Sequence, residues 1–331
     1  MPNPYISGTG FFLPPRVVTN DELSKYINTT DEWIQERTGI KERRYVDAGV
    51  GPSDLAIPAT QQALEAAGLQ VSDIDFIIFA TSTPDFYAPG SGCLLQEKME
   101  FNEIGALDIR VQCSGFLYGL SIAEQYIKTS MFNNILLIGA EVQSTAMHLT
   151  DEGRDTAVIF GDGAGAAIIS ATEEDRGILS THMHSEGKYL KELWLESPAS
   201  NAGHPRITSE DLDKGKQYLK MNGREVFRHA VTRFPEVINE SLVANNLTTD
   251  DIDLLIPHQA NLRITQMVQK KLRLSDEKVF SNIHKYGNTT AGTIPIALAE
   301  AINAGKISSG DIVIFAAFGS GFTWASAAIK W

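Results

Sequence analysis

The second half of this chain repeats the pattern of the first half, and this repeat limits the possible folds more than any other feature of the sequence. Residues 72–80 resemble residues 250–257 at an offset of 178 residues (253 − 75). Residues 134–140 resemble residues 311–317 at an offset of 177 (311 − 134), and an Ala-Glu pair in the helical stretches before them recurs at an offset of 176 (299 − 123). Near-equal offsets between like elements indicate a long internal duplication, because chance similarity between buried strands does not explain a shared offset.

Both halves alternate helical patterns with short apolar strands. Residues 53–67 and 222–244 have helical periodicity, and the repeated apolar segments read as strands. This alternation is typical of α/β folds in which helices cover parallel sheets. The polar segment 171–177 follows a strand-like run, so we expect an N-terminal half at residues 1–172 and a C-terminal half at residues 173–331.

Two segments rich in small and polar residues read as connections. The run Gly161–Gly165 contains three glycines and precedes the strand-like residues 166–170, which predicts a tight turn between strands. A dinucleotide-binding loop needs a different glycine spacing and a helix after it. Residues 182–217 are polar and weakly periodic, and we expect a long surface excursion there; such loops often act as functional covers.

Cys113 is one of two cysteines and opens a helix-like stretch. The residues before it read as a strand, Ser114 and Gly115 suit a sharp turn, and apolar residues follow at helical spacing. A thiol at a helix N-terminus faces free backbone N–H groups and the positive end of the helix dipole, which favour the reactive thiolate. We expect Cys113 to be a nucleophile that reacts faster than Cys93, whose apolar neighbours predict burial. The alternative is a buried structural cysteine.

Two polar residues in the C-terminal half are candidate partners for this thiol. His258 follows the apolar run Ile252–Ile256, and Asn288 lies in a turn of small residues that reads as the end of another strand. A cysteine with a distant His and Asn is a candidate for thiol chemistry, since such partners meet in space and not in sequence. Sites in α/β folds gather at strand ends. Taken singly, a core histidine and a turn asparagine are the alternatives.

The composition excludes several classes of protein. With 43% hydrophobic and 21% charged residues, the chain is typical of a soluble globular protein, and no segment is long enough to span a bilayer. The N-terminus lacks a secretory pattern, and two cysteines favour a reducing compartment, so we expect a cytoplasmic protein. A net charge of −13 argues against a nucleic-acid partner.

One cationic cluster stands out on this acidic chain. Arg263, Lys270, Lys271 and Arg273 have spacings that could align several of them on one helical face. The cluster is either a solvated helix surface or a local docking site for an acidic partner.

Six long motifs, spread over the whole chain, resemble the β-ketoacyl-acyl-carrier-protein synthase III family of the thiolase superfamily. They are Thr30–Ile40, Cys113–Phe116, Ile159–Gly165, Pro257–Arg263, Gly287–Thr289 and Phe318–Trp324. The resemblance implies a thiolase-like, duplicated five-layer αβαβα fold, a homodimer without cofactor or metal, and a catalytic triad of Cys113, His258 and Asn288. The implied reaction is a decarboxylating condensation of an acyl-CoA primer with malonyl-acyl-carrier protein through an acyl-Cys113 intermediate, which starts fatty-acid synthesis.

The resemblance also implies roles for individual residues. The expected substrate contacts are Trp33 and Arg154 at the CoA adenine, Arg37, Gly223 and Asn261 along the CoA tunnel, Ala88 in the acyl pocket of the partner subunit, and Arg263, Lys270 and Lys271 at the carrier protein. Backbone N–H groups of Cys113 and Ser320 should bind the oxyanion of acyl transfer. His258 and Asn288 should donate to the enolate oxygen, for which a neutral His258 with a hydrogen on Nε2 suffices.

The sequence departs from the family pattern at three of these places. Gln112 and Ser320 stand where small residues are common, and Ala88 replaces a bulky aromatic residue of acetyl-preferring relatives. These changes leave the identity of the acyl primer undecided. The alternative is therefore a paralogous acyltransferase or condensing enzyme of a specialised pathway that moves the acyl group to a different acceptor.

Three other readings fit the sequence less well. A papain-like hydrolase conflicts with the duplicated α/β pattern. A catalytically inactive partner subunit that keeps the fold only for binding would not need the intact set of Cys113, His258 and Asn288. A hydroxymethylglutaryl-CoA synthase needs a catalytic glutamate upstream, and Glu97 and Glu100 read as an ordinary helix end.

Overall fold

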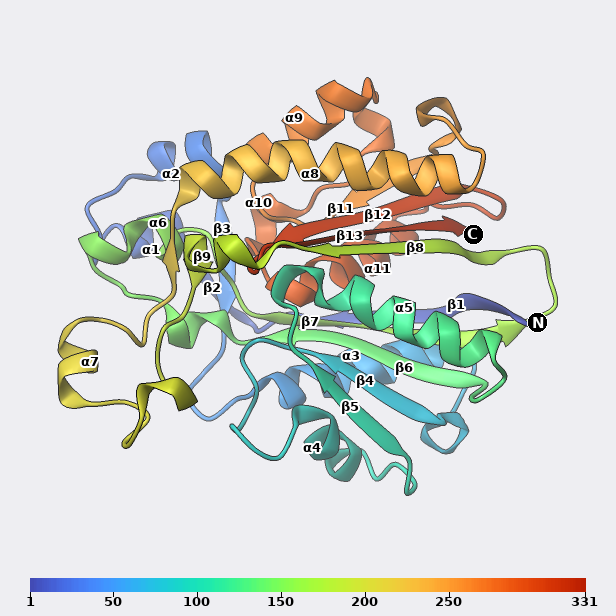
Figure 1. Ribbon diagram of the computed structural model, residues 1–331, viewed down its shortest axis with the longest axis horizontal. Helices are drawn as coiled ribbons and strands as arrows, with labels where there is room; N and C mark the ends of the chain where they lie inside the picture. Colours follow the sequence, from blue (N-terminus) through green and yellow to red (C-terminus); the bar gives the residue numbers. More distant parts are fainter.

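Two β-sheets lie face to face with a pair of helices between them and further helices outside each sheet (Figure 1). The computed structural model describes all residues, 1–331. The first sheet has the order β1-β7-β6-β4-β5, and the second has the order β11-β12-β13-β8. Their strands are β1 (Asn3–Phe12), β4 (Phe76–Ala80), β5 (Gly105–Ile109), β6 (Asn134–Glu141), β7 (Gly163–Thr172), β8 (Gly177–Ser185), β11 (Leu254–Pro257), β12 (Ile312–Gly319) and β13 (Thr323–Lys330).

The helices form the other three layers of a thiolase-like αβαβα arrangement. The helices of these layers are α3 (Pro52–Ala67) and α4 (Ser91–Lys98) outside the first sheet, α5 (Gly115–Lys128) and α11 (Thr293–Asn303) between the sheets, and α8 (Gly223–Ala244) and α9 (Leu262–Leu272) outside the second. The other helices are α1 (Asn20–Leu23), α2 (Asp31–Thr38), α6 (Arg154–Ala157), α7 (Ser209–Asp213) and α10 (Ile283–Tyr286). Two small sheets complete the fold: β2 (Arg16–Thr19) pairs with β3 (Glu42–Tyr45), and β9 (Leu193–Trp194) pairs with β10 (Lys220–Met221). None of the helices has both the length and the apolar character that crossing a bilayer requires.

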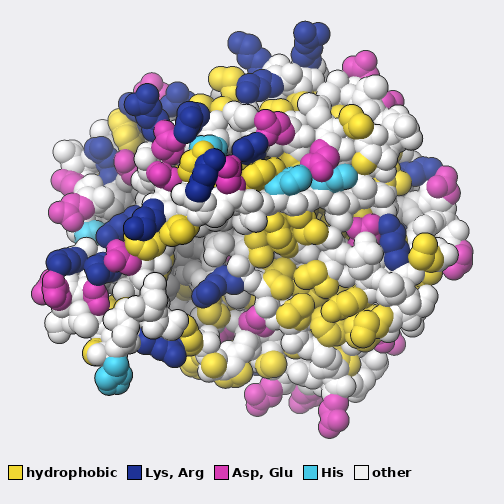
Figure 2. All heavy atoms as spheres, in the orientation of Figure 1, with side chains coloured by type: hydrophobic (Ala, Val, Ile, Leu, Met, Phe, Trp, Pro, Cys, Tyr) yellow, Lys and Arg dark blue, Asp and Glu magenta, His cyan; other side chains and the backbone are white.

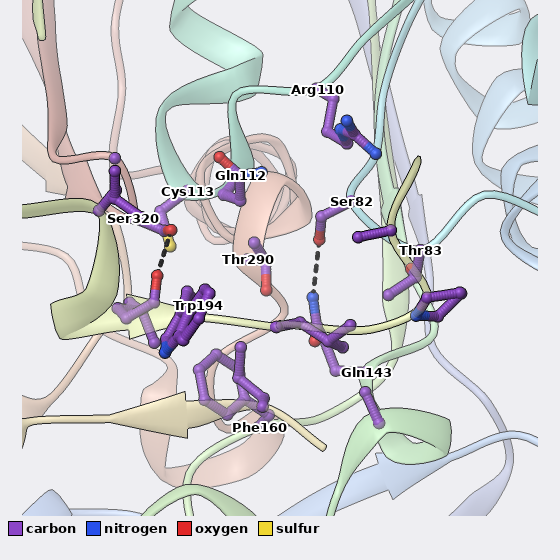
Figure 3. Close-up of a pocket in the computed structure, with 18 of the residues that line it drawn as sticks. Ser82, Thr83, Arg110, Gln112, Cys113, Gln143, Phe160, Trp194, Thr290 and Ser320 are labelled. Carbon is purple, nitrogen blue, oxygen red and sulfur yellow. Dashed lines mark hydrogen bonds between the residues drawn. The ribbon is translucent and has the colours of Figure 1, made fainter. Parts of the chain in front are cut away.

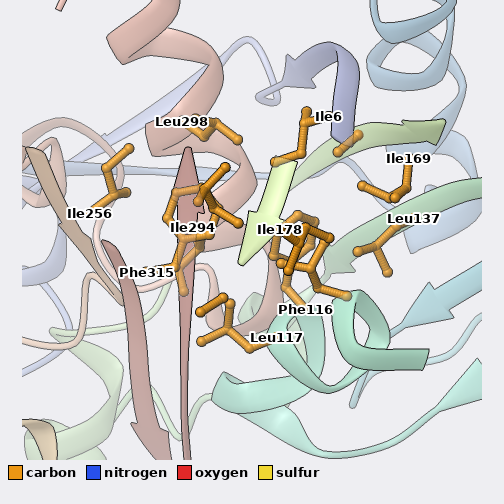
Figure 4. Packing of buried hydrophobic residues seen from close by; sticks show 14 of the residues in the cluster. Ile6, Phe116, Leu117, Leu137, Ile169, Ile178, Ile256, Ile294, Leu298 and Phe315 are labelled. Carbon is orange, nitrogen blue, oxygen red and sulfur yellow. The ribbon is translucent and has the colours of Figure 1, made fainter. Parts of the chain in front are cut away.

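The largest apolar cluster fills the space between the two sheets. It contains Phe116 and Leu117 of α5, Ile294 of α11 and inward-facing strand residues such as Leu137 and Phe315 (Figure 4). Each fully buried side chain of this size contributes roughly 1.5–3 kcal/mol relative to an exposed one. The layer therefore holds α5 and α11 firmly, and both helices begin at the candidate site.

The structure shows the duplication more sharply than the sequence does. β4 and β11 begin 178 residues apart (254 − 76), as do β6 and β12 (312 − 134) and α5 and α11 (293 − 115). The change from the first sheet to the second falls between the end of β7 at Thr172 and the start of β8 at Gly177.

Two connections differ from the sequence prediction. The glycine run is not a tight turn, because Gly163 already starts β7 and Gly165 lies inside it. A Cβ on Gly165 would lie 2.7 Å from the backbone nitrogen of Ile296, so glycine here lets α11 approach the strand closely. The surface excursion begins only after Ser185, because residues 182–185 continue β8 and pair with β13.

Candidate active site

Cys113 lies in a single 3₁₀ turn, η2 (Gln112–Ser114), between strand β5 and helix α5. Cys113 is only 5% exposed, and the backbone N–H groups of Cys113 and Ser320 act on its sulfur to favour the charged form. Gly319 packs directly on it, since a Cβ at that position would lie 2.7 Å from Sγ. The turn is strained, because the non-glycine residue Gln112 has a left-handed φ of 46°. The predicted turn between a strand and a helix at Cys113 is confirmed, and its role as a nucleophile stays a prediction.

The ionisation of this thiol differs from the prediction. Burial, with a smaller contribution from the nearby Glu141, raises the pKa of the Cys113 thiol to about 12. The two backbone N–H groups act in the opposite direction but do not outweigh the loss of solvent. Burial therefore favours the neutral thiol of Cys113, which differs from the expectation that the helix start favours the thiolate.

His258 follows β11, as predicted, and its ring is buried. Nδ1 lies 2.6 Å from Thr293 Oγ1, and Nε2 has no hydrogen-bond partner. Burial lowers the pKa of His258 to about 3, so the imidazole is neutral at physiological pH. A neutral imidazole with one free nitrogen facing a cavity can bind a substrate oxygen without carrying charge.

Asn288 lies beside a second 3₁₀ turn, η9 (Thr290–Gly292). It follows the short helix α10 and not a strand, which corrects the sequence prediction. Thr290 donates its backbone N–H to Asn288 Oδ1 at 2.8 Å, which leaves the Nδ2 hydrogens free for another acceptor.

The two turns are copies of one another. η2 and η9 begin 178 residues apart (290 − 112), and their first residues, Gln112 and Thr290, both have left-handed φ values, of 46° and 50°. Ala291 therefore occupies the position of Cys113 in the second half. One copy of the turn carries Cys113, and the other begins with Thr290, whose backbone N–H binds Asn288.

Two cavities meet at Cys113. The smaller, of about 110 Å³, is lined by Cys113, His258 and Asn288 together with the predicted tunnel residues Gly223 and Asn261. The structure thus brings the triad together in one place. Gly223 is the first residue of α8 and Asn261 caps the start of α9, so the beginnings of both helices line this cavity.

The larger cavity, of about 490 Å³, extends from Cys113 under residues of the surface excursion. Figure 3 shows Cys113 and Ser320 close together at its wall, with Trp194 and Phe160 below them and Ser82 and Gln143 across from them. Ser320 has no left-handed φ, so a side chain is tolerated there, and its hydroxyl donates to the carbonyl of Leu193 in the cover. The departure from glycine at position 320 therefore keeps the backbone donor and ties the cover to the site.

The predicted adenine contacts also lie together. Trp33 is on α2, where Thr30 Oγ1 accepts its backbone N–H at 3.1 Å as a helix cap. The guanidinium groups of Arg154 and Arg37 lie 4.8 and 5.5 Å from the Trp33 ring. Asn261 donates from Nδ2 to the backbone carbonyl of Arg37 at 3.0 Å, which joins α2 to the start of α9. The group offers an aromatic face and two cations to a nucleotide.

The cationic residues lie on α9, whose first turn lines the smaller cavity. Arg263, Lys270 and Lys271 are exposed. The Arg263 guanidinium lies 5.9 Å from the ring of Phe227 on α8, and Lys271 donates to the carbonyl of Val231 at 2.7 Å. Figure 2 shows Lys and Arg side chains gathered over the α8 and α9 side of the molecule. Ala88 lies in an exposed loop and lines neither cavity of its own chain, so its role in a partner subunit stays a prediction.

Sequence reasoning missed several residues of the site. Glu141 is fully buried at the end of β6 and accepts from Ser82 and Thr83 at 3.1 and 2.7 Å, which fixes the loop after β4. Burial raises the pKa of Glu141 to about 7. Arg110 is the only charged residue among the 21 that line the larger cavity. The one available signal for Glu141 was a carboxylate at the end of an otherwise apolar strand.

The reactivity of the two cysteines can be tested directly, and the structure changes the expected order. Cys93 is exposed and Cys113 is buried, opposite to the sequence prediction for Cys93. Iodoacetamide at pH 7 should therefore alkylate Cys93 first, whereas an acyl-CoA should modify only Cys113, because only Cys113 lies between two cavities. Peptide mass spectrometry over time separates the two sites. Faster alkylation of Cys113 would show that the backbone donors outweigh burial, and acylation of Cys93 would contradict the site.

Comparison with known proteins relates this geometry to one group of enzymes. Family models described as 3-oxoacyl-[acyl-carrier-protein] synthase III match residues 107–187 and, for its C-terminal part, residues 242–331. The β-ketoacyl-[acyl-carrier-protein] synthase III of Caldanaerobacter subterraneus subsp. tengcongensis is 46% identical over 326 residues, covering 98% of this chain and 97% of the relative. That of Xanthomonas campestris pv. campestris is 43% identical over 329 residues, covering 98% of each.

Solved structures give the same result. The 3-oxoacyl-[acyl-carrier-protein] synthase III of Aquifex aeolicus superposes with a TM-score of 0.90 at 41% identity, covering 99% of this chain and 100% of that chain. The synthase III of Thermus thermophilus superposes with a TM-score of 0.91 at 38% identity, covering 99% of both chains.

Proposed function

Since this chain belongs to the β-ketoacyl-acyl-carrier-protein synthase III family, and so is an acyltransferase that starts fatty-acid synthesis by condensation, we propose that Cys113, His258 and Asn288 carry out its reaction. The observation that supports this assignment most directly is the single cavity that these three residues line. The proposal takes acyl-CoA and malonyl-acyl-carrier protein as the two substrates.

In the first half-reaction Cys113 Sγ attacks the carbonyl carbon of the acyl-CoA thioester. The backbone N–H groups of Cys113 and Ser320, which act on the sulfur in the free protein, donate hydrogen bonds to the oxyanion of the tetrahedral intermediate. The bond to the CoA sulfur then breaks, and CoA leaves as a thiol with the proton that Cys113 gave up. The acyl chain enters the larger cavity, because the smaller one holds His258 and Asn288 and leads to the CoA contacts. One difficult condensation thus becomes two displacements.

In the second half-reaction the malonyl group replaces CoA in the smaller cavity. Its thioester oxygen accepts hydrogen bonds from His258 Nε2 and Asn288 Nδ2, the two free nitrogens of the triad. Loss of carbon dioxide places negative charge on this oxygen, and both donors stabilise it without a metal. The enolate carbon then attacks the acyl-Cys113 carbonyl, the bond from that carbon to Sγ breaks, and the β-ketoacyl product leaves while the Cys113 thiolate takes up a proton from solvent. Two donors for an enolate favour this condensation over transfer to a hydroxyl or an amine.

Mass spectrometry of the intact protein tests the assignment. After incubation with a panel of acyl-CoAs, the mass should rise by one acyl group located on Cys113, and malonyl-acyl-carrier protein should then discharge it as a β-ketoacyl product. Cys113→Ala is the matched control and should stay unmodified. An acyl-enzyme that discharges only to water or to an amine would contradict the condensation.

The proposal includes a homodimer in the cytoplasm. β5 is an edge strand of the first sheet, and half-buried apolar side chains surround it and α5, among them Ile109, Tyr118, Ile122 and Tyr126. Figure 2 shows hydrophobic side chains gathered on this face. Edge strands and apolar faces of this kind are usually covered in proteins, and a second copy would cover both. The two unpaired cysteines favour a reducing compartment. Sedimentation should show a dimer, and a monomer at assay concentration would contradict it.

Arg263→Glu should weaken the use of malonyl-acyl-carrier protein at least tenfold and leave acylation by acyl-CoA unchanged. Arg263 is an exposed cation on a protein of net negative charge, and it lies at the start of α9 between Asn261 and Ile264, which line the smaller cavity. Steady-state kinetics at several salt concentrations measure the effect, which should fade as salt screens the charge. Lys306→Glu is the control, because Lys306 follows the far end of α11. An equal loss of activity with both substrates would mean that Arg263 does not act specifically on the carrier protein.

Ala88→Phe should shift primer preference toward acetyl-CoA. The predicted contact is between Ala88 of one subunit and the acyl cavity of its partner, and a phenyl ring there would remove space for several methylenes. Each buried methylene contributes about 0.8 kcal/mol. Competition between acetyl-CoA and octanoyl-CoA measures the ratio, which should favour the longer primer in the unmodified enzyme. Tyr87, the neighbouring residue, lines the cavity of its own chain, so an effect of Tyr87→Ala alone would assign the role to Tyr87.

A further inference from the structure

The imidazole of His258 is held by one side chain, that of Thr293 at the start of α11. His258 and Thr293 are 1% and 2% exposed, so bulk water does not take part in this contact. A neutral histidine carries its hydrogen on one of two nitrogens. The group that Nδ1 meets therefore decides whether Nε2 is a donor or an acceptor in the cavity.

The Thr293 hydroxyl has one hydrogen and two neighbours that could accept it. The carbonyl of Thr290 lies 3.0 Å from Oγ1 and also accepts the backbone N–H of Thr293, so it could take the hydroxyl hydrogen only on its second lone pair. His258 Nδ1 lies closer, at 2.6 Å, and Thr293 is its one hydrogen-bond partner. The hydroxyl hydrogen is therefore best placed on the line to Nδ1, and the hydrogen of the ring is then on Nε2.

We propose that Thr293 is the positioning residue that fixes His258 as an Nε2–H donor, so that His258 donates a hydrogen bond to the substrate oxygen and never takes the proton of Cys113. This inference rests on the proposed function, because the donor acts on the enolate oxygen. It follows that the thiol proton leaves with CoA without passing through the imidazole. An unpaired, buried Nε2–H is costly in the free enzyme, and the substrate oxygen removes that cost.

The same turn orients the second donor. The backbone N–H of Thr290 binds Asn288 Oδ1, and the residues of η9 lead directly into α11, whose first residue is Thr293. The C-terminal copy of the nucleophile turn thus sets the direction of both donors. This gives a role to the copy that lacks the cysteine.

Three variants test the proposal. Thr293→Val keeps the shape of the side chain but loses the hydroxyl, and it should slow malonyl decarboxylation at least tenfold while acylation of Cys113 stays within twofold. Thr293→Ser keeps the hydroxyl and should restore decarboxylation to within about threefold of the unmodified enzyme. Thr60→Val is the matched control, because Thr60 is a fully buried threonine of α3 whose hydroxyl has no partner. It should change neither rate.

NMR of enzyme that contains ¹⁵N-labelled histidine shows which ring nitrogen of His258 carries the hydrogen. This pattern would not change if Thr293 had only a structural role. The signal of His258, identified by its loss in His258→Ala, should show a protonated Nε2 and an unprotonated Nδ1, and Thr293→Val should change this pattern. A protonated Nδ1 in the unmodified enzyme, or normal decarboxylation by Thr293→Val, would overturn the inference while leaving the condensation intact. Failure of the unmodified enzyme to form acyl-Cys113 or to decarboxylate malonyl would instead overturn the proposed function.

Discussion

Replacing His258 with alanine should slow malonyl decarboxylation by roughly a hundred- to a thousandfold, the usual loss when one oxyanion donor is removed. Cys113 should still accept an acyl group at a near-normal rate, because its own oxyanion donors are backbone N–H groups of Cys113 and Ser320. The two half-reactions can be followed separately, by mass spectrometry of the acyl-enzyme and by release of labelled carbon dioxide. Asn288→Ala should have the same selective effect.

The pH dependence provides an independent check on the same residue. Burial lowers the pKa of His258 to about 3, so the ring is already neutral at pH 5 and stays neutral as the pH rises. Decarboxylation by the preformed acyl-enzyme should therefore show no step near pH 6.5, the ordinary range of histidine. His204→Ala, at an exposed position, is the control and should leave both half-reactions unchanged. Normal decarboxylation by His258→Ala, or a step near pH 6.5 that this variant lacks, would contradict a neutral donor.

The sequence predicts well those features that depend on short, local residue patterns. Apolar runs of strand length and helical periodicity define β4, β6, β11, β12, α3 and α8, and the shared offset identifies the duplication. Cys113 was predicted because it opens a helix-like stretch after a strand-like segment, and His258 because it follows an apolar run at a strand end. Asn288 was found from its small-residue turn, although the element before it is helix α10 and not a strand.

The features that could not be predicted depend on contacts between distant segments. Whether Cys93 is buried depends on which face of α4 meets the first sheet, and the Gly-Cys-Leu-Leu pattern does not decide this. The pKa of Cys113 depends on complete burial under the loop at Gly319 and on Glu141 from another strand. Thr293 is 35 residues from His258, so nothing local links the two.

Gly319→Ala should reduce turnover at least a hundredfold, although it adds only one methyl group. Gly319 ends β12, and a Cβ there would lie 2.4 Å from Cys113 Cβ and 2.7 Å from Sγ, which real Cβ atoms do not tolerate. The φ of Gly319 is not left-handed, so alanine meets no backbone strain and the contact with Cys113 is the whole effect.

Both groups that could move to relieve this contact belong to the catalytic machinery. If Cys113 shifts, it leaves the start of α5 and the triad; if Gly319 shifts, the backbone N–H of Ser320 no longer points at the oxyanion. A displacement of about 1 Å can cost a hundredfold in rate. Acylation of Cys113 should fall together with turnover, unlike in His258→Ala, while circular dichroism shows a folded protein. Gly187→Ala is the matched control, because a Cβ there meets no atom within 4 Å. Acylation at the wild-type rate by Gly319→Ala would mean that the end of β12 can move without disturbing the oxyanion donors. The close contact between Gly319 and Cys113 would then not be what positions the nucleophile.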